Sequence, residues 1–171
     1  NRINTPEVAE EVLERGDADM VSMARPFLAD SDFVAKAAQG KSEEINTCIG
    51  CNQACLDHVF SGKLTSCLVN PRACHETEII VKDTTAAKKL AVIGAGPAGL
   101  AFATTAAARG HDVTLYDAAS EIGGQFNVAK QVPGKEEFFE TIRYFGKQIE
   151  LSGVNLKLDT RVSADDLNNG A

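Results

Sequence analysis

The stretch Lys89-Leu90-Ala91-Val92-Ile93-Gly94-Ala95-Gly96-Pro97-Ala98-Gly99 decides the fold of the C-terminal half of the chain. A short apolar run leads directly into a G-x-G-x-x-G pattern, and an alanine-rich segment from Leu100 to Arg109 follows. This order predicts a buried β-strand, a tight glycine turn and an α-helix, the first unit of a Rossmann-like α/β fold with a parallel sheet. Gly94 permits the tight turn, Gly96 lets the backbone approach a pyrophosphate, and Gly99 lets the helix pack close to the strand.

The residues beyond this helix complete a dinucleotide-binding pattern. Asp112 to Asp117 reads as the second strand, and Asp117 lies 18 residues after Gly99, where its carboxylate can accept hydrogen bonds from ribose hydroxyls. The pyrophosphate would sit at the helix N-terminus, where backbone N–H groups and the helix dipole favour an anion. The alternative is a glycine turn that binds no ligand. The predicted binding residues of the loop are Gly94, Ala95, Gly96, Pro97, Ala98 and Gly99.

The segment after Asp117 narrows the choice of dinucleotide. A second glycine pair, Gly123-Gly124, lets the chain pass close to a bulky ligand and, together with Pro97, favours FAD over a nicotinamide nucleotide. A long helix is predicted from about residue 135 to 152, followed by a strand over 154–158 and a helix start at Ser163. Its expected buried side consists of Phe138, Phe139, Ile142, Phe145 and Ile149. Residues 88–171 therefore form the predicted nucleotide-binding domain, after a linker over 76–87.

Upstream of the linker, residues 43–75 contain all five cysteines of the chain. Four of them form a C-x2-C-x3-C-x11-C pattern made by Cys48, Cys51, Cys55 and Cys67. Closely spaced thiolates favour a soft metal centre over disulfides, either an iron–sulfur cluster or a zinc ion. Cys74 is a surplus thiol, and His58 and His75 are expected to be hydrogen-bonded loop residues, because four cysteines already complete a ligand set.

Residues 1–42 read as a helix, a short buried strand over 19–23 and a second helix, which is the order found in a parallel α/β barrel. Thr5 is expected to cap the first helix, Val8, Val12 and Leu13 to form its buried stripe, and Asp30 or Ser31 to cap the second. In such a barrel the loops after strands 7 and 8 commonly hold a phosphate. The N–H groups of Ala24 and Arg25, with the Arg25 guanidinium, could bind one; a solvated surface turn is the alternative.

The composition and the charge of the chain limit the classes of function that it can have. The chain has 171 residues, 44% hydrophobic and 24% charged, and a net charge of −7, which argues against general nucleic-acid binding. No apolar run reaches the length of a membrane span and no signal-peptide pattern is present, so we expect a cytoplasmic protein that binds neither nucleic acid nor membrane. Because the chain begins at Asn1 without Met and stops where a helix begins, we interpret it as an internal fragment of a longer protein.

Taken together, the motifs resemble one family. They are similar to the iron–sulfur flavoenzymes typified by bacterial NADPH-dependent 2,4-dienoyl-CoA reductase, which are related to trimethylamine dehydrogenase and the old yellow enzyme group. The matching segments run in family order along the chain: Met23-Ala24-Arg25-Pro26, the four cysteines with Asn52, Thr65 to Pro71, Gly94 to Leu100, and Glu121-Ile122-Gly123-Gly124-Gln125-Phe126.

The resemblance implies an α/β architecture in three parts: the end of an FMN-binding (β/α)8 barrel over 1–42, an iron–sulfur segment over 43–75 and the first part of a Rossmann-like FAD domain over 88–171. It also implies the following ligands: Cys48, Cys51, Cys55 and Cys67 for a [4Fe–4S] cluster, Ala24 and Arg25 for the FMN phosphate, and the Gly94–Gly99 loop, Asp117, Gln125 and the Val162 backbone for FAD. No catalytic residue would lie in this fragment. In the complete enzyme NADPH would reduce a dienoyl-CoA through FAD, cluster and FMN, in the oxidation of unsaturated fatty acids.

Three alternatives stay open from the sequence. The same machinery could reduce another enone or flavin substrate, or oxidise an amine. The cysteines could instead bind zinc in an interaction module fused to a nucleotide-binding domain, although zinc sites of four cysteines usually pair two C-x2-C knuckles. Finally, the chain could be an FAD-only electron-transfer partner without a barrel.

Overall fold

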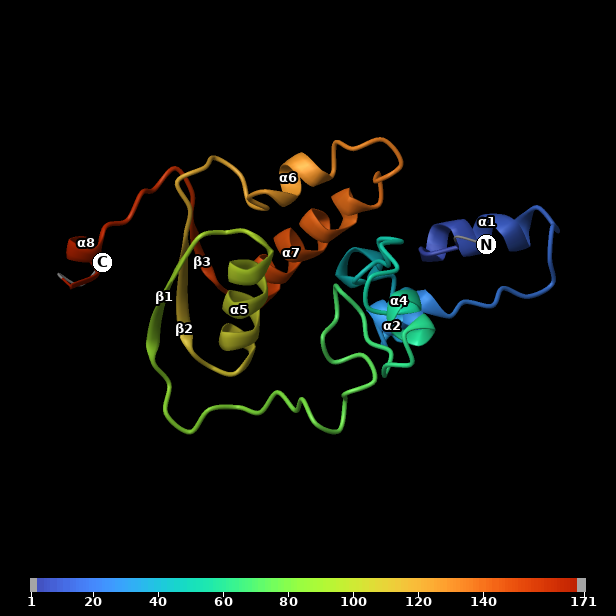
Figure 1. The fold of residues 1–171 in the computed structure, drawn as a ribbon, viewed down its shortest axis with the longest axis horizontal. Helices are drawn as coiled ribbons and strands as arrows, with labels where there is room; N and C mark the ends of the chain where they lie inside the picture. The colour runs from blue at the N-terminus through green and yellow to red at the C-terminus, as the bar shows by residue number, and fades with distance from the viewer. Residues whose placement is uncertain (1–2, 169–171) are drawn as a thin grey trace. The chain divides into compact units, whose positions relative to one another are not determined.

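The computed structural model describes residues 3–168, and the chain divides after Ile80 into two compact units (Figure 1). The fold is mixed α/β. Within the described residues, its one sheet has three parallel strands in the order β1-β2-β3 and lies in the C-terminal unit. No described helix is both long and apolar enough to cross a bilayer.

The C-terminal unit follows the predicted order of elements. Its strands are β1 (Lys89–Ile93), β2 (Asp112–Tyr116) and β3 (Asn155–Lys157). Its helices are α5 (Pro97–Ala108), α6 (Phe126–Ala129), α7 (Phe138–Ser152) and α8 (Ala164–Asn168). Gly153 ends α7 in the left-handed conformation at φ 71°, as a glycine C-cap does. Ser163 caps α8, because its Oγ accepts from the Asp166 N–H while the Asp166 carboxylate accepts from Ser163.

Alternate strand residues divide the sheet into a covered and an open face. Helix α5 packs against β1, β2 and α7 on the covered face (Figure 1). The core on this side consists of Val92, Ala95, Leu100, Ala103, Ala106, Val113, Leu115, Ile149 and Val154. Small side chains on α5 let it approach the strands closely. The opposite face carries polar strand residues such as Thr114, Asn155 and Lys157 around an open hollow.

The N-terminal unit is built from short helices and loops. Its described elements are α1 (Pro6–Glu14), α2 (Arg25–Ala29), α3 (Phe33–Ala38), the 3-10 turn η1 (Ser42–Glu44) and α4 (Leu56–Phe60). The predicted cap of α1 is confirmed, since the Thr5 hydroxyl accepts from the Val8 N–H at 3.4 Å. The apolar interior is small and consists of Ala29, Phe33, Ile45, Ile49 and Ala73.

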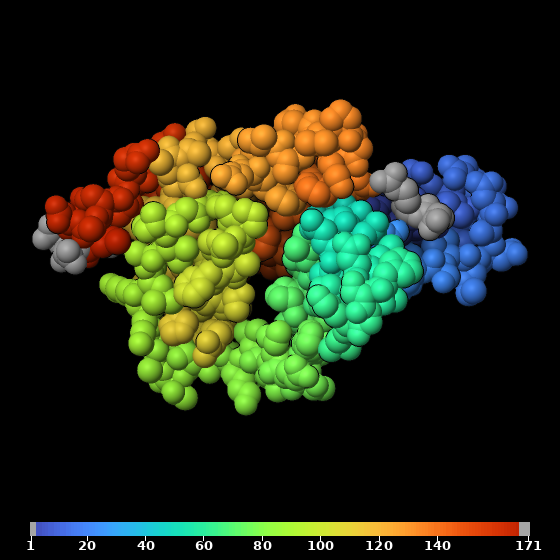
Figure 2. Space-filling view, viewed as in Figure 1, coloured from blue at the N-terminus to red at the C-terminus, as the bar shows by residue number. Residues whose placement is uncertain are grey.

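Several sequence predictions for this unit are wrong. Residues 19–23 form no strand, and Met20 is 79% exposed, because the described sheet consists of β1, β2 and β3 and offers these residues no ladder. None of the described residues of α1 is buried, so the expected stripe of Val8, Val12 and Leu13 is only partly covered. Helix α1 lies within the blue region of Figure 2. Neither expected cap starts α3, whose N-cap is Asp32 without a side-chain bond.

Two predictions for the C-terminal unit also need correction. Strand β1 is not buried along its length: only Val92 is, and Ile93 remains 52% exposed, because β1 is an edge strand of the described sheet. On α7 the expected aromatic stripe is incomplete. Ile149 is buried, while Phe139 is 47% exposed and lies under the Lys130 ammonium at 5.0 Å.

Candidate functional site

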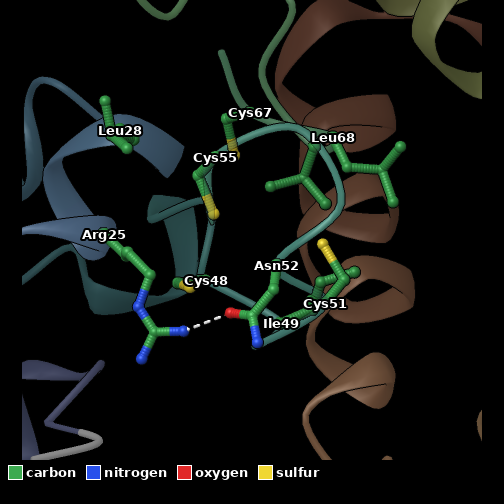
Figure 3. A pocket seen from close by; sticks show the side chains of 10 residues that line it. Arg25, Leu28, Cys48, Ile49, Cys51, Asn52, Cys55, Cys67 and Leu68 are labelled. Carbon is green, nitrogen blue, oxygen red and sulfur yellow. Dashed lines mark hydrogen bonds between the residues drawn. The ribbon is translucent and has the colours of Figure 1, made fainter. Parts of the chain in front are cut away.

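The four predicted cluster cysteines line a single hollow in the N-terminal unit. The hollow is small and partly open to solvent. Figure 3 shows the cysteine side chains arranged around this space. The complete lining is Arg25, Leu28, Cys48, Ile49, Cys51, Asn52, Cys55, Cys67, Leu68 and Val69. The structure thus brings the four thiols together from two segments of the chain.

Local backbone geometry turns the first three thiols toward the hollow. Gly50 and Asn52 both adopt left-handed conformations at φ 62°, which glycine and asparagine tolerate best. Ile49, which precedes Gly50, is only 3% exposed and anchors the loop in the unit's interior. Helix α4 begins directly after Cys55 and ends the turn. The C-x2-C-x3-C spacing is therefore realised as a compact loop and not as one side of a helix.

Hydrogen bonds between residues far apart in the sequence hold Cys67 at the same hollow. The Ser66 N–H donates to the Ala54 carbonyl at 2.8 Å, which ties the fourth cysteine to the first three. The Asn46 amide donates to the Val69 carbonyl at 2.8 Å, and the Asn70 amide donates to the Leu28 carbonyl at 2.9 Å. These asparagines hold the segment around Cys67 against residues far away in sequence. Sequence reasoning missed Asn46, and its position two residues before the first cysteine was the only signal.

The buried carboxylate of Asp30 helps to hold the segment that precedes Cys48. Asp30 is 6% exposed, and its Oδ2 lies 2.6 Å from the Lys36 Nζ and accepts from the Asn46 N–H at 2.8 Å. Its Oδ1 accepts from the Asp32 N–H at 3.0 Å. Asp30 thereby connects the start of α3 to the segment that leads into Cys48. Its role differs from the helix cap predicted for it.

Burial and the neighbouring groups change the pKa of two cysteines in the hollow. Burial raises the pKa of the Cys48 thiol, and charges on Cys51 and Cys55 add to the rise, while the Gly50 N–H and Arg25 oppose it. Burial likewise raises the pKa of Cys67, with contributions from Cys48 and Cys51. In the free protein these thiols therefore hold their protons. Binding a metal centre would release them, as thiolate ligation requires.

Two kinds of metal centre take four thiolate donors. Within residues 3–168, no three His, Cys, Asp or Glu side chains come close enough together to hold one metal ion. A tetrahedral zinc ion with Zn–S bonds of about 2.3 Å needs sulfurs roughly 3.8 Å apart. An iron–sulfur cluster is a larger body that takes four thiolates on different iron atoms. The four thiols that line the hollow are the soft donors that either centre requires.

The remaining cysteine and the two histidines lie outside the lining. Cys74 is exposed. His58 Nδ1 lies 3.0 Å from the Leu64 carbonyl, and His75 Nδ1 lies 2.9 Å from the Glu78 carboxylate. Both histidines are hydrogen-bonded, as predicted, but only His75 lies in a loop, because His58 belongs to α4.

The predicted phosphate residues lie at the start of α2. Ala24 is the N-cap residue and Arg25 the first helical residue. The Arg25 Nη1 donates to the Asn52 Oδ1 at 2.6 Å, so the guanidinium is turned toward the cysteine loop (Figure 3). Binding of the FMN phosphate by these two residues stays a prediction.

The glycine loop of the C-terminal unit has the close packing that its sequence predicts. A Cβ on Gly99 would stand 1.9 Å from the Gly94 carbonyl oxygen, so only glycine fits there. A Cβ on Gly124 would stand 3.2 Å from the Gly96 Cα, which means that the two glycine turns touch through their backbones. No side chain caps α5, so its first N–H groups are available to an anion. This cradle fits a dinucleotide pyrophosphate.

Asp117 organises the same loop. Its Oδ2 accepts from the Ala95 N–H at 2.6 Å and its Oδ1 accepts from the Ala119 N–H at 2.8 Å. A carboxylate has about four lone-pair sites, so it can still accept from a ribose hydroxyl. Gln125 is exposed at the N-cap of α6, and Val162 is half-buried before α8. Their contacts with FAD stay predictions.

Both units of the chain are similar to parts of known proteins. Residues 1–44 match the NADH:flavin oxidoreductase / NADH oxidase family, and residues 92–145 match the NAD(P)-binding Rossmann-like domain. A metal reductase of Desulforamulus reducens is 44% identical over 98% of this chain and 25% of its own length. The chain is similar to one segment of the old yellow enzyme/trimethylamine dehydrogenase-like flavin oxidoreductases.

Solved structures of these flavin oxidoreductases share the fold closely. A 2-naphthoyl-CoA reductase in complex with 2-naphthoyl-CoA matches at 39% identity and a TM-score of 0.95, over 98% of this chain and 26% of its own. The histamine dehydrogenase from Rhizobium sp. 4-9 matches at 31% identity and a TM-score of 0.87, over 98% and 25% respectively. The chain thus spans about a quarter of the length of the flavin oxidoreductases that it matches.

Proposed function

We propose that this chain carries the electron-transfer segment of an NAD(P)H-dependent flavin and iron–sulfur oxidoreductase. The single observation that carries the proposal is the set of four cysteines around one hollow. Cys48, Cys51, Cys55 and Cys67 would hold a [4Fe–4S] cluster there. When bound, such a cluster passes electrons singly between flavins, which handle electrons in pairs.

The C-terminal unit would bind FAD. Its glycine loop and the uncapped start of α5 would hold the pyrophosphate, and Asp117 would hold both the loop and the ribose. Contact between Gly96 and Gly124 supports this role, because two backbones without side chains leave room for a bulky ligand. Ala24 and Arg25 would hold the phosphate of FMN, and NADPH would be the electron donor of the whole protein.

For the substrate, we propose a conjugated acyl-CoA of the 2,4-dienoyl-CoA type, as in the oxidation of unsaturated fatty acids. The likeness to a 2-naphthoyl-CoA reductase supports an acyl-CoA with conjugated double bonds. The overall reaction would transfer a hydride equivalent from NADPH and a proton from solvent to the conjugated system. Amine oxidation is the second candidate, supported by the likeness to histamine dehydrogenase, and it would run electrons in the opposite direction.

Cofactor content tests the proposal. Protein purified without oxygen should contain iron and acid-labile sulfide in equal amounts, and should absorb broadly at about 400 nm until it is reduced. Cys51→Ser should lose most of this absorbance, because a hydroxyl is a poor replacement for a thiolate. Cys74→Ser is the matched control and should keep it, since Cys74 is exposed and away from the hollow. A colourless protein that binds one zinc ion would overturn the proposal.

The choice between substrates needs a separate assay. NADPH consumption with a 2,4-dienoyl-CoA, followed without oxygen, should exceed dye reduction with histamine or dimethylamine. The reverse order would reject acyl-CoA reduction and favour amine oxidation.

A further inference from the structure

Arg25, one of the two residues proposed to hold the FMN phosphate, also contacts Asn52 at the cysteine hollow. The Arg25 Nη1 donates to the Asn52 Oδ1 at 2.6 Å, and both residues line the cysteine hollow. Among the described residues of this lining, Arg25 alone carries a permanently charged side chain. Figure 3 shows its guanidinium beside Cys48, joined to Asn52 by the hydrogen bond.

Both ends of this contact are fixed by the backbone. Arg25 is the first residue of α2 and is followed by the buried Pro26, so its Cα has little freedom. Asn52 lies between Cys51 and Cys55 at φ 62°, and its carbonyl accepts from the Asp57 N–H at 3.1 Å. A guanidinium stays protonated at every pH at which proteins fold. The hollow therefore faces a fixed positive charge that cannot titrate away.

The surroundings strengthen the effect of that charge. Leu28, Ile49, Leu68 and Val69 supply the apolar part of the lining. A charge acts more strongly across apolar side chains than across water, because the local dielectric constant is lower. The potential of an iron–sulfur cluster depends on nearby charge, on hydrogen bonds and on solvent exposure.

We propose that Asn52 is a positioning residue that holds the Arg25 guanidinium at the cysteine hollow, where its charge raises the reduction potential of the bound cluster. This inference rests on the proposed function, since it requires a cluster at the four cysteines. The physical reason is simple: an added electron makes the centre more negative, so a fixed cation stabilises the reduced state more than the oxidised state. The pair would thereby set how readily the centre accepts an electron.

Two variants separate the charge from its placement. Arg25→Gln removes the charge and keeps an amide that can donate to Asn52. Asn52→Gly removes the acceptor and leaves Arg25 intact, and glycine suits the left-handed backbone at this position. Lys63→Gln is the matched control, because it removes a positive charge from an exposed position of the same segment, outside the lining.

The readout is the midpoint potential of the cluster in anaerobically purified protein, titrated with dithionite and followed by electron paramagnetic resonance. Arg25→Gln should lower the ratio of reduced to oxidised cluster about tenfold at a given potential, or about 59 mV for one electron. Asn52→Gly should lower the midpoint potential by a smaller amount, and Lys63→Gln should leave the midpoint potential unchanged. Iron and labile sulfide should be the same in all variants.

The experiment distinguishes a failure of the proposed function from a failure of this inference alone. If the unaltered protein contains no cluster, the proposed function is wrong, and this inference is wrong with it. If it contains the cluster but Arg25→Gln and Asn52→Gly both keep its midpoint, the inference alone is overturned. Should Arg25→Gln fail to assemble a cluster, the midpoint of Asn52→Gly decides the question.

Discussion

Replacement of Asp30 by alanine should loosen the segment that leads into the cysteine loop. Asp30 is 6% exposed and meets three donors: the Lys36 Nζ at 2.6 Å, the Asn46 N–H at 2.8 Å and the Asp32 N–H at 3.0 Å. Alanine accepts from none of them. The Asn46 N–H, which lies in a buried residue, would lose its carboxylate acceptor just before Cys48.

The size of the effect follows from the burial of the two charges. Removing one member of a buried ion pair typically costs about 3–5 kcal/mol. Lys36 keeps 24% of its side chain in solvent and also donates to the Glu44 carbonyl at 3.1 Å, so the lower end applies. A loss of about 3 kcal/mol corresponds to a roughly 100-fold change in a local opening equilibrium. Asp30→Asn, which keeps one acceptor oxygen, should lose less.

Hydrogen exchange followed by mass spectrometry measures this opening directly. Peptides that contain Asn46 should exchange about 100-fold faster in Asp30→Ala, while peptides of β1 and β2 should be unaffected. Asp32→Ala is the matched control, since Asp32 is exposed and its side chain makes no capping bond. If Asp30→Ala exchanges no faster than Asp32→Ala, the carboxylate does not hold the segment, and the reasoning from its contacts is refuted.

Three further outcomes test the two sites. Gly99→Ala should lower the melting temperature of the C-terminal unit by about 10 °C, because its Cβ would overlap the Gly94 carbonyl. Gly96→Ala, whose Cβ meets no atom within 4 Å, should keep the stability of the unit but lose FAD. Calorimetry and flavin titration measure the two effects, and an unchanged melting temperature for Gly99→Ala or FAD binding by Gly96→Ala would contradict them. Asp117→Ala should weaken FAD binding about tenfold in the same titration, and unchanged affinity would reject the ribose role. In cluster-free protein, burial raises the pKa of Cys48, so the stability contributed by its protonated thiol is complete below pH 9.0 and is lost as pH rises through the folded pKa. Alkylation of Cys48 below pH 9.0 should therefore be slower than that of exposed Cys74, and faster labelling of Cys48 by mass spectrometry would contradict this.

The C-terminal unit could be predicted largely from sequence because its signals are local. The glycine turn, the helix after it and the strand before Asp117 lie where the pattern predicts them. Gly153 ends α7 at the predicted residue, since a glycine C-cap depends only on its own backbone. The helix starts at Phe138, three residues later than predicted, because Lys135 and its neighbours form a turn after Gly134. The exposure of β1 and Phe139 was not predictable, because burial depends on which elements lie alongside.

The N-terminal unit shows the limit of the same reasoning. The cysteine spacing indicates that the thiols meet, and the structure does bring them to one hollow. How they meet depends on contacts between distant residues: Asn70 donates across 42 positions to Leu28, and Arg25 across 27 positions to Asn52. No periodicity or spacing encodes such pairs. The predicted strand over 19–23 fails for the same reason, since a strand is defined by a partner.

The two units therefore owe their order to different interactions. The C-terminal unit packs Leu100, Leu115 and Ile149 into a continuous apolar core. The N-terminal unit has a smaller interior and relies on polar cross-links from Asp30, Asn46 and Asn70, which hold the segments that carry the cysteines. A metal centre bound by the four thiols would hold together the same segments that these hydrogen bonds already connect. Its binding free energy would then be folding free energy for the N-terminal unit, while the stability of the other unit would rest on its core and its nucleotide.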